Sequence, residues 1–323
     1  MTRICIPNDY PVELSPPDIT AYRAGNTGVD FVHRLDSGRP GPAVGITAIV
    51  HGNEPCGAIA LAWLLEHDIR PVRGSLTLAF VNTAAYARFD PADPNATRWL
   101  EEDLNRVWSP EVLDGPRRSA ELDRARALRP VVETLDVLLD IHSMQHPTAP
   151  LMLAGPLDKG RELARRVGVP ALVVSDAGHK AGNRLRDYGG FADPASPKNA
   201  LLVECGQHWA AEAASHAIET TLRFLHATGS VAPDCGVDFL SSRPARAPQR
   251  FAEVTEAVTI TTDRFAFAQP YRGLETITDA GTLIAMDGDR EVRTPYDDCI
   301  LIMPSKRLWP GQTAVRFARL IAG

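Results

Sequence analysis

Four side chains suited to metal binding or acid–base catalysis stand at the ends of apolar runs. His51 and Glu54 follow the run VGITAIV, His142 ends VLLDIH, and Glu204 ends ALLVE. A carboxylate at the end of a buried strand is costly unless it is paired, hydrogen-bonded or bound to a metal. Two histidines and a glutamate form a ligand set of catalytic zinc sites, which keep one position open for water. We therefore predict a metal site at His51, Glu54 and His142, with Glu204 as the general base or acid.

Polar residues near these positions could orient a ligand or hold a substrate. Asp140 precedes His142 by two residues, so both would share one face of a strand and the carboxylate could orient the imidazole. Pairing of Asp140 with an arginine is the alternative. The segment RWLEEDLNRVW carries Arg98, Asn105 and Arg106, which could clamp a carboxylate and polarise a carbonyl. Its alternative is an ordinary loop with solvated arginines.

The Gly- and Pro-rich stretch at residues 177–199 is too long for a simple connection. Loops of this length often form lids or binding surfaces. Arg184, Arg186 and Tyr188 are its candidate substrate contacts.

The elements that must position these residues alternate between strand and helix. This alternation predicts an α/β domain with a mostly parallel sheet, whose carboxyl edge is the usual place for a ligand. Helical patterns follow at 58–67, with Pro55 near the first turn, and at 210–225. The expected strands are residues 44–50, 75–81, 137–142, 171–175 and 200–204, with an edge strand near 29–35.

The character of the chain changes after the linker-like segment ATGSVAPDCG at 227–236. Short β-rich runs such as EVTEAVTITT and CILIMP follow, separated by Gly, Pro and Asp. We predict a catalytic α/β domain at residues 1–230 and a smaller all-β domain at residues 235–323.

Composition narrows the class of protein. The 323 residues are 44% hydrophobic and 23% charged, as in a globular protein, and the net charge of −6 argues against nucleic acid or an anionic membrane as partner. The five cysteines form no C-x-x-C pair, and we expect free thiols. With neither a secretory leader nor a membrane span expected, the prediction is a cytoplasmic protein.

The motifs HGNEPCG, DLNR, DIHS and LLVECGQ, in this order, resemble the aspartoacylase/succinylglutamate desuccinylase family. That family is related to the zinc carboxypeptidases. The resemblance implies a zinc-carboxypeptidase-like fold, with a mostly parallel or mixed sheet, flanking helices and a smaller C-terminal β domain. It also implies a metal-dependent deacylase with one Zn²⁺ per chain, held by His51, Glu54 and His142.

The resemblance also implies roles for individual residues. Glu204 matches the catalytic glutamate, Asn105 and Arg106 match the pair that holds the substrate carboxylate, and Arg98 matches an arginine that polarises the scissile carbonyl. The implied substrate is a small anionic N-acyl amino acid of the acetyl or succinyl type. A homodimer is compatible with the resemblance.

Three departures bear on the substrate. Pro194 stands where aspartoacylase has an arginine about ten residues before the catalytic glutamate, and Ser143 replaces an asparagine. The tyrosine that completes the aspartoacylase pocket is assigned to neither Tyr271 nor Tyr296. Two other functions therefore stay open: a zinc carboxypeptidase acting on short peptides, and a non-catalytic zinc-dependent binding protein.

Overall fold

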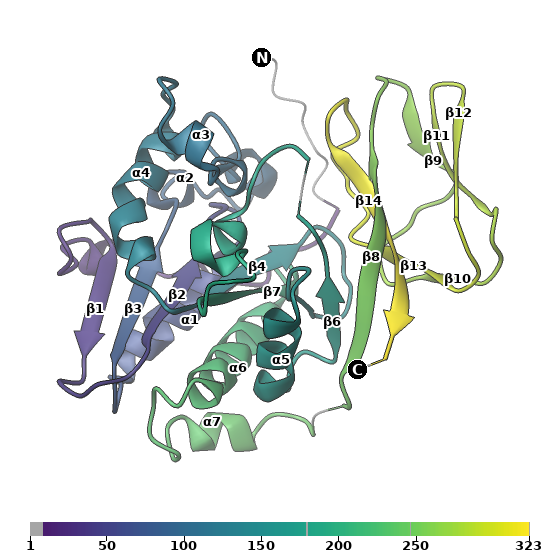
Figure 1. Ribbon diagram of the computed structural model, residues 1–323. Helices are drawn as coiled ribbons and strands as arrows, with labels where there is room; N and C mark the ends of the chain where they lie inside the picture. The colour runs from purple at the N-terminus through teal and green to yellow at the C-terminus, as the bar shows by residue number, and fades with distance from the viewer. Residues whose placement is uncertain (1–8, 179, 246, 323) are drawn as a thin grey trace.

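An eleven-stranded mixed sheet runs through the protein, and a three-stranded antiparallel sheet lies at its C-terminal end (Figure 1). The computed structural model describes residues 9–178, 180–245 and 247–322. The strand order of the large sheet is β1-β3-β2-β4-β7-β5-β6-β8-β14-β13-β10, and that of the small sheet is β12-β11-β9. The strands of the main α/β part are β1 (Val32–Asp36), β2 (Ala43–Ala48), β3 (Ser75–Phe80), β4 (Val137–Met144), β5 (Leu151–Leu153), β6 (Leu172–Ser175) and β7 (Asn199–Gln207). Those that follow are β8 (Arg250–Thr259), β9 (Phe265–Phe267), β10 (Thr276–Ile277), β11 (Leu283–Asp287), β12 (Arg290–Arg293), β13 (Cys299–Ile302) and β14 (Thr313–Ile321).

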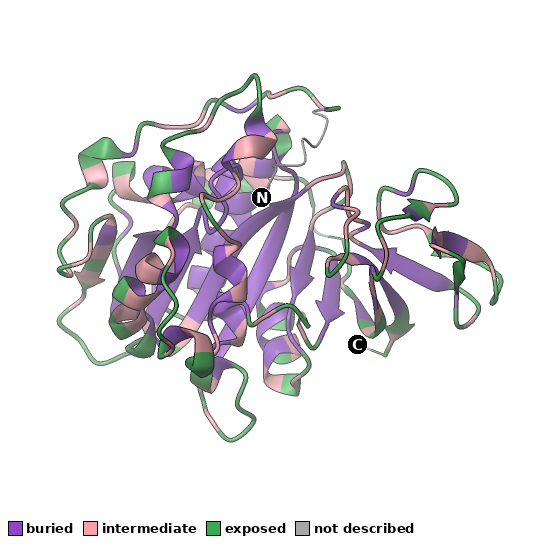
Figure 2. Cartoon of the chain, turned by 90° about the horizontal axis from the view of Figure 1, so that it is seen from above, coloured by how far each residue is buried: buried purple, intermediate pink, exposed green. Residues whose placement is uncertain are grey.

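Strands β3, β2, β4 and β7 are parallel neighbours at the centre of the sheet. Their residues are almost all buried, as the purple strands in Figure 2 show. Continuous apolar runs suit such strands, because helices cover both faces of a parallel sheet. The carboxyl ends of these strands therefore lie along one edge, and the register pairs His142 of β4 with Glu204 of β7.

Helices pack on both faces of the sheet and build two hydrophobic clusters. The first cluster joins α1, α5 and α6 to side chains such as Leu139 and Ile141 of β4. The second joins α4 and the segment around Trp108 to the opposite face, where Leu138 points. Asp140 and His142 share the face of Leu138, because strand side chains alternate. The α-helices are α1 (Pro55–Glu66), α2 (Thr83–Tyr86), α3 (Pro110–Leu113), α4 (Ala120–Glu133), α5 (Asp158–Val167), α6 (Ala211–Ala227) and α7 (Val237–Ser241), and the 3₁₀ turns are η1 (Thr20–Tyr22), η2 (Pro94–Thr97), η3 (Leu104–Arg106), η4 (Leu185–Asp187) and η5 (Gly189–Phe191).

The mixed α/β class expected from the sequence is confirmed. The predicted strands at 44–50, 75–81, 137–142, 171–175 and 200–204 correspond to β2, β3, β4, β6 and β7, and no end is shifted by more than three residues. The sequence did not predict β5, which lies between β7 and β6 and runs antiparallel to β7. Three apolar residues after a proline carry too little periodicity to be identified as a strand.

The C-terminal strands extend the main sheet rather than forming only a separate one. Strand β8 pairs in parallel with β6, and β14, β13 and β10 follow it with antiparallel pairing. The small sheet of β9, β11 and β12 then packs beyond this extension (Figure 1). Asp287, at the end of β11, accepts hydrogen bonds from the backbone and hydroxyl groups of Thr261 and Thr262 and so ties the two sheets together.

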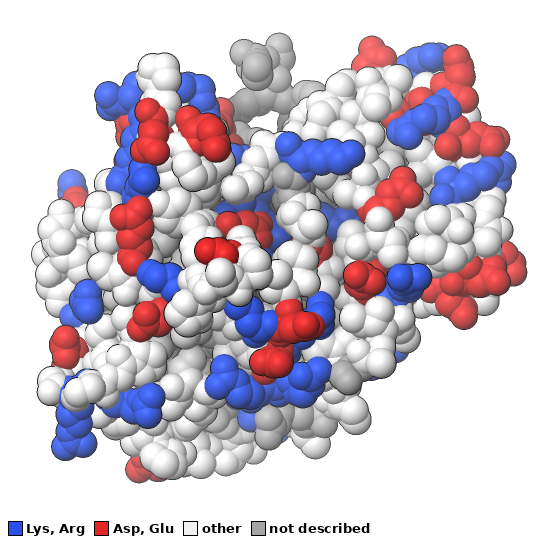
Figure 3. Space-filling view, viewed as in Figure 1, with Lys and Arg blue, Asp and Glu red and all other residues white. Residues whose placement is uncertain are grey.

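Three further features concern the cysteines, the charged surface and the length of the helices. Cys56, Cys205, Cys235 and Cys299 are free, and Cys5 lies outside the described residues. On the face seen in Figure 3, acidic and basic side chains are interspersed. Within the described part of the chain, no helix is both long and apolar enough to cross a membrane.

Candidate metal centre

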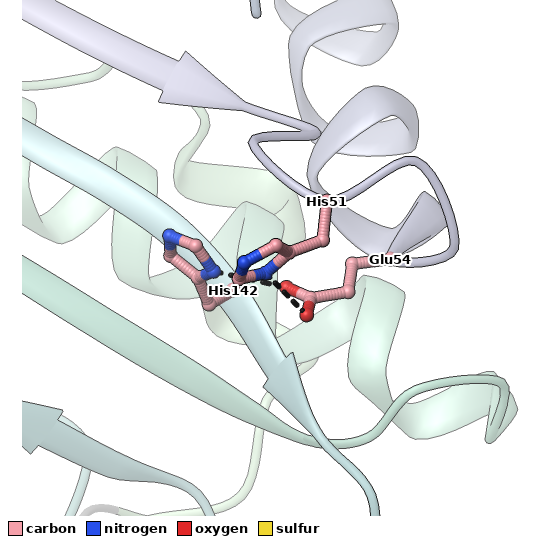
Figure 4. Close-up of side chains that lie close together, drawn as sticks. All are labelled: His51, Glu54 and His142. Atoms are coloured by element: carbon pink, nitrogen blue, oxygen red, sulfur yellow. Dashed lines mark hydrogen bonds and ion pairs between the residues drawn. The ribbon is translucent and has the colours of Figure 1, made fainter. Parts of the chain in front are cut away.

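His51, Glu54 and His142 meet in space although two of them lie far from the third in sequence (Figure 4). Nδ1 of His51 lies 2.8 Å from Oε1 of Glu54, and Nδ1 of His142 lies 3.0 Å from Oε2 of the same carboxylate. One ligand atom from each of the three lies within 4.8 Å of the others. All three side chains are buried, so their donor atoms face one another out of bulk water.

The turn after β2 carries His51 and Glu54. Its backbone is held to the next strand, since Val81 and Asn82 donate their N–H groups to the carbonyls of residues 48 and 49. Gly52 sits where two other segments approach: a Cβ there would lie about 2.5 Å from backbone atoms of residues 85 and 97. The N–H of Gly52 also donates to the carbonyl of Arg98 over 2.9 Å. The glycine of the motif HGNEP therefore allows the close backbone approach that brings Arg98 to the site.

Each histidine has a second carboxylate on its other ring nitrogen. Nε2 of His142 lies 2.9 Å from Oδ2 of Asp140, and Nε2 of His51 lies 2.9 Å from Oδ1 of Asp103. The hydroxyl of Thr47 donates to the remaining oxygen of Asp140 over 2.6 Å. The carboxylate on Nε2 of His142 can hold the proton there and leave the lone pair of Nδ1 for a metal, the usual arrangement around ligating imidazoles. Nε2 of His51 is shared, because an N–H group of Arg98 also lies 2.8 Å from it. The imidazole of His142 is thus oriented toward a cation beside Glu54.

The charges around the triad also fit a cation. Burial alone would raise the pKa of Glu54, but His51 and His142 outweigh burial and hold it well below its usual range. Burial would lower the pKa of His142, yet Asp140 and Glu54 raise it well above its usual range. Three carboxylates thus surround two imidazoles, and Arg98 is paired with one of these carboxylates. Two imidazoles and a carboxylate are ligand types that zinc prefers.

Glu204 lies beside the triad on the neighbouring strand. Its Oε2 atom is buried and has no hydrogen-bond partner among the described residues. Burial raises the pKa of Glu204 to about 8, against the opposing charge of His142. A carboxyl group with this environment can exchange a proton near neutral pH.

Arg98 contacts two of the triad residues directly. Its Nη1 donates to Oε1 of Glu54 over 2.9 Å, and its Nη2 lies 2.8 Å from Nε2 of His51. Asn105 is fixed by the N–H of Leu185, which donates to its side-chain oxygen over 2.9 Å. Arg106 lies 3.9 Å from Asp103. The structure therefore brings the three polar residues of the segment RWLEEDLNRVW to the metal centre.

A pocket of about 950 Å³, its open mouth included, lies over this centre. The triad, Glu204, Arg98, Asn105 and Arg106 all line it. The C-terminal strands and loops supply the facing wall, which contains Arg272, Met303, Pro304, Ser305, Arg307, Gly311, Gln312, Thr313 and Arg316.

Comparison with known proteins decides the family. Residues 40–228 match the family described as the succinylglutamate desuccinylase/aspartoacylase catalytic domain. The chain belongs to this family. Its members are amidohydrolases that act on non-peptide acyl amide bonds, as the resemblance of the four motifs implied. No protein among the curated ones matches the sequence.

Solved structures share the fold of this family member. The succinylglutamate desuccinylase of Vibrio cholerae superposes with a TM-score of 0.64 at 15% identity, covering 90% of this chain and 86% of that one. The ectoine utilization protein EutE (DoeB) of Ruegeria pomeroyi gives 0.60 at 16%, covering 90% and 89%. Murine aminoacylase 3 gives 0.57 at 18%, covering 88% and 96%.

In this desuccinylase/aspartoacylase family member, the loop residues expected to contact substrate differ in position. Arg184 lines the pocket but is paired with Asp176 and Asp187. Arg186 is buried away from the metal centre and donates to the carbonyls of residues 154 and 200. Tyr188 donates to Glu133 over 2.7 Å and lies outside the pocket lining. The structure therefore brings only Arg184 of these three to the pocket.

Among the pocket residues that the sequence did not predict are Asp103, His208 and Arg307. Asp103 belongs to the acidic run LEED. His208 is buried, with Nδ1 2.8 Å from the hydroxyl of Ser143, and burial lowers its pKa to about 3. Arg307 comes from the loop before β14. Asp103, two residues before Asn105 in DLNR, is the one that the motif itself could have indicated.

Proposed function

We propose that this chain is a zinc-dependent deacylase that hydrolyses the amide bond of a small N-acyl amino acid of the acetyl or succinyl type. The single observation that carries the proposal is the buried triad of His51, Glu54 and His142 with Glu204 in the same pocket. Family membership supplies the reaction class. The carboxylate behind His142 favours Nδ1 of that histidine as the ligand atom, and Nδ1 of His51 faces the same carboxylate of Glu54.

Zinc is the metal that this donor set fits. Two imidazoles and one carboxylate are a known three-ligand set of catalytic zinc sites, which keep a fourth position open. A Zn²⁺ ion held there would supply a Lewis acid that polarises the acyl carbonyl and lowers the pKa of water.

Glu204 is proposed to move the proton. Its raised pKa suits a group that takes a proton from the attacking water and passes it to the leaving amine. The unpartnered Oε2 atom supports this role, because a structural carboxylate at such depth would have its oxygens satisfied.

The arginines and Asn105 are proposed to hold the substrate. Arg98 lies beside the triad, where its N–H groups can donate to negative charge that develops on the carbonyl oxygen. Asn105 and Arg106 line the same pocket and are proposed to bind the α-carboxylate of the amino acid. They would set position more than chemistry.

Several coarser predictions belong to the same proposal. We keep residues 1–230 as the catalytic domain and 235–323 as the domain that shapes access, since the latter supplies a pocket wall. Free thiols support a reducing cytoplasmic location.

The test is amine release from N-acetyl and N-succinyl amino acids by zinc-loaded protein, with a chelated sample and a dipeptide panel in parallel. We expect chelator-sensitive release from N-acyl amino acids, restored by added Zn²⁺, and none from His142→Ala. Release from dipeptides alone would support the carboxypeptidase alternative and refute the proposal. Stoichiometric zinc without turnover on any substrate would support the binding-protein alternative.

A further inference from the structure

Arg307 is a buried arginine of the pocket with no carboxylate of the described residues at ion-pair distance. It stands in the loop between β13 and β14 and is 8% exposed. No carboxylate of the described residues lies within ion-pair distance, and its side chain makes no hydrogen bond to them. The Nη2 atom is buried and unpartnered.

The other buried arginines of the pocket differ from Arg307 because a carboxylate lies within ion-pair distance of each. Among the described residues, Arg184 and Arg316 are the other buried arginines of the lining, and Asp176 lies 2.8 Å from the first and 3.8 Å from the second. Burial and the charge of Arg98 lower the pKa of Arg307 well below its usual range, although the charges of Asp103 and Glu54 oppose this shift. A buried guanidinium is costly when no carboxylate pairs with it directly. An anion from outside the chain, bound in the pocket that Arg307 lines, would supply such a partner.

The position of Arg307 is fixed by the fold. Its guanidinium carbon lies 5.4 Å from the ring centre of Trp99, whose other neighbour, Arg98, lies at the same distance. This cation–π contact helps to fix the guanidinium and uses none of its N–H groups, which stay available for another acceptor. The backbone nearby is anchored as well, because the N–H of Lys306 donates to Gln145, just after β4, over 2.7 Å.

We infer that Arg307 is a specificity-determining residue that binds a second carboxylate of the substrate, separate from the α-carboxylate assigned to Asn105 and Arg106. This inference rests on the proposed function. Among N-acyl amino acids, Arg307 would select those with an additional carboxylate on the acyl group or on the side chain. A planar fork with free N–H groups suits a carboxylate through two parallel hydrogen bonds.

The experiment compares matched substrates that differ in one charge. The pairs are N-acetylaspartate with N-acetylasparagine, N-acetylglutamate with N-acetylglutamine, and N-succinylalanine with N-butanoylalanine. We expect the wild-type protein to prefer the charged member of at least one pair. In Arg307→Gln, kcat/KM for that member should fall on the order of 10- to 100-fold while the neutral member stays within about threefold.

Two variants separate this role from a general effect of charge or folding. Arg307→Lys keeps the charge but loses the fork, so part of the preference should remain. Arg272→Gln removes an exposed arginine from the pocket rim and should leave the preference unchanged. A structural arginine would instead give a lower Tm and equal losses on both members of every pair. That result, an unchanged preference in Arg307→Gln, or the same loss in Arg272→Gln, would overturn the inference.

A binding measurement keeps the inference testable if no substrate is turned over. Succinate and butanoate are titrated calorimetrically into zinc-loaded wild-type protein and Arg307→Gln. Tighter binding of succinate by the wild type, lost in the variant, would support the second-carboxylate site even if the proposed reaction fails. Equal affinity for the two anions, or the same preference in Arg307→Gln, would refute the site while leaving the deacylase proposal standing.

Discussion

At the residue scale, the metal centre is a set of paired contacts around two imidazoles. Glu54 lies against Nδ1 of both His51 and His142, and Asp103 and Asp140 hold the opposite nitrogens. The sequence placed Asp140 through strand periodicity. Periodicity gives no information on Asp103, which reaches His51 from a loop 52 residues away; only its place in the motif DLNR could have indicated it.

Removing these supporting charges should weaken metal binding without removing a ligand. We expect Asp140→Asn and Asp103→Asn each to lower zinc affinity about 10- to 100-fold, because the imidazole loses its orienting carboxylate. Competition with a chromophoric chelator measures the affinity. Asp136→Asn, which removes an exposed carboxylate near the opposite end of β4, serves as control. Wild-type affinity in both site variants would show that these carboxylates do not support the metal.

Replacement of Glu204 should lower turnover without lowering zinc binding. Glu204→Gln keeps size and hydrogen-bonding capacity but cannot accept a proton, so turnover should fall about 10²- to 10⁴-fold. Zinc content, measured by atomic absorption on the purified variant, should stay at one per chain. Full activity in the zinc-loaded variant would remove Glu204 from the proton-transfer role.

At the element scale, parallel strands that end together bring distant residues to one site. The sequence could predict β2, β4 and β7 because each is a continuous apolar run. A histidine or glutamate at the carboxyl end of each run indicated where the site lies. It could not predict Arg307, since KRLWPG has the composition of a solvated turn. Nor could it show that Arg186 and Tyr188 would find their hydrogen-bond partners away from the pocket, because those contacts depend on tertiary packing.

The turn after β2 tests the role of close backbone approach. Gly52→Ala should place a methyl group within about 3 Å of neighbouring backbone, and overpacking of this kind destabilises by about 1–3 kcal/mol. We also expect weaker zinc binding, because the turn carries His51 and Glu54. Chemical denaturation and zinc titration measure the two effects. An alanine variant with wild-type stability and zinc affinity would show that the turn accommodates the added methyl group, and would contradict this prediction.

At the scale of the whole molecule, the sheet joins the catalytic strands to the C-terminal strands without a break. Strand β8 pairs with β6, and the loop before β14 closes the pocket. The sequence predicted the change to β structure after residue 235, but composition gives no sign of which strands pair across a linker. Partner strands are chosen by packing and register, which act between residues far apart in the chain.

The junction of the two sheets should respond to acid. Burial would raise the pKa of Asp287, but the hydrogen bonds from Thr261 and Thr262 and the ion pair with Arg290 lower it below its usual range. Because the folded pKa is the lower one, this contribution is present above the unfolded value of about 3.9 and is lost as pH falls through the folded pKa.

Asp287→Asn removes that contribution. We expect it to lower the free energy of unfolding at pH 7 by about 1.5–3 kcal/mol, the range of a charged hydrogen bond. Melting curves of both proteins between pH 7 and pH 2 measure the difference, which should shrink in acid. A difference that stays constant with pH would contradict the assigned role of the carboxylate.

The loop before β14 has a consequence for the order in which the protein acquires its properties. A chain emerging from the ribosome exposes its N-terminal part first, and domains generally fold in that order. The proposed metal ligands lie between residues 51 and 142, whereas Arg307 and the rest of the facing wall follow residue 270. On these proposals, a nascent chain would acquire its metal ligands long before it acquires the residue that selects among substrates.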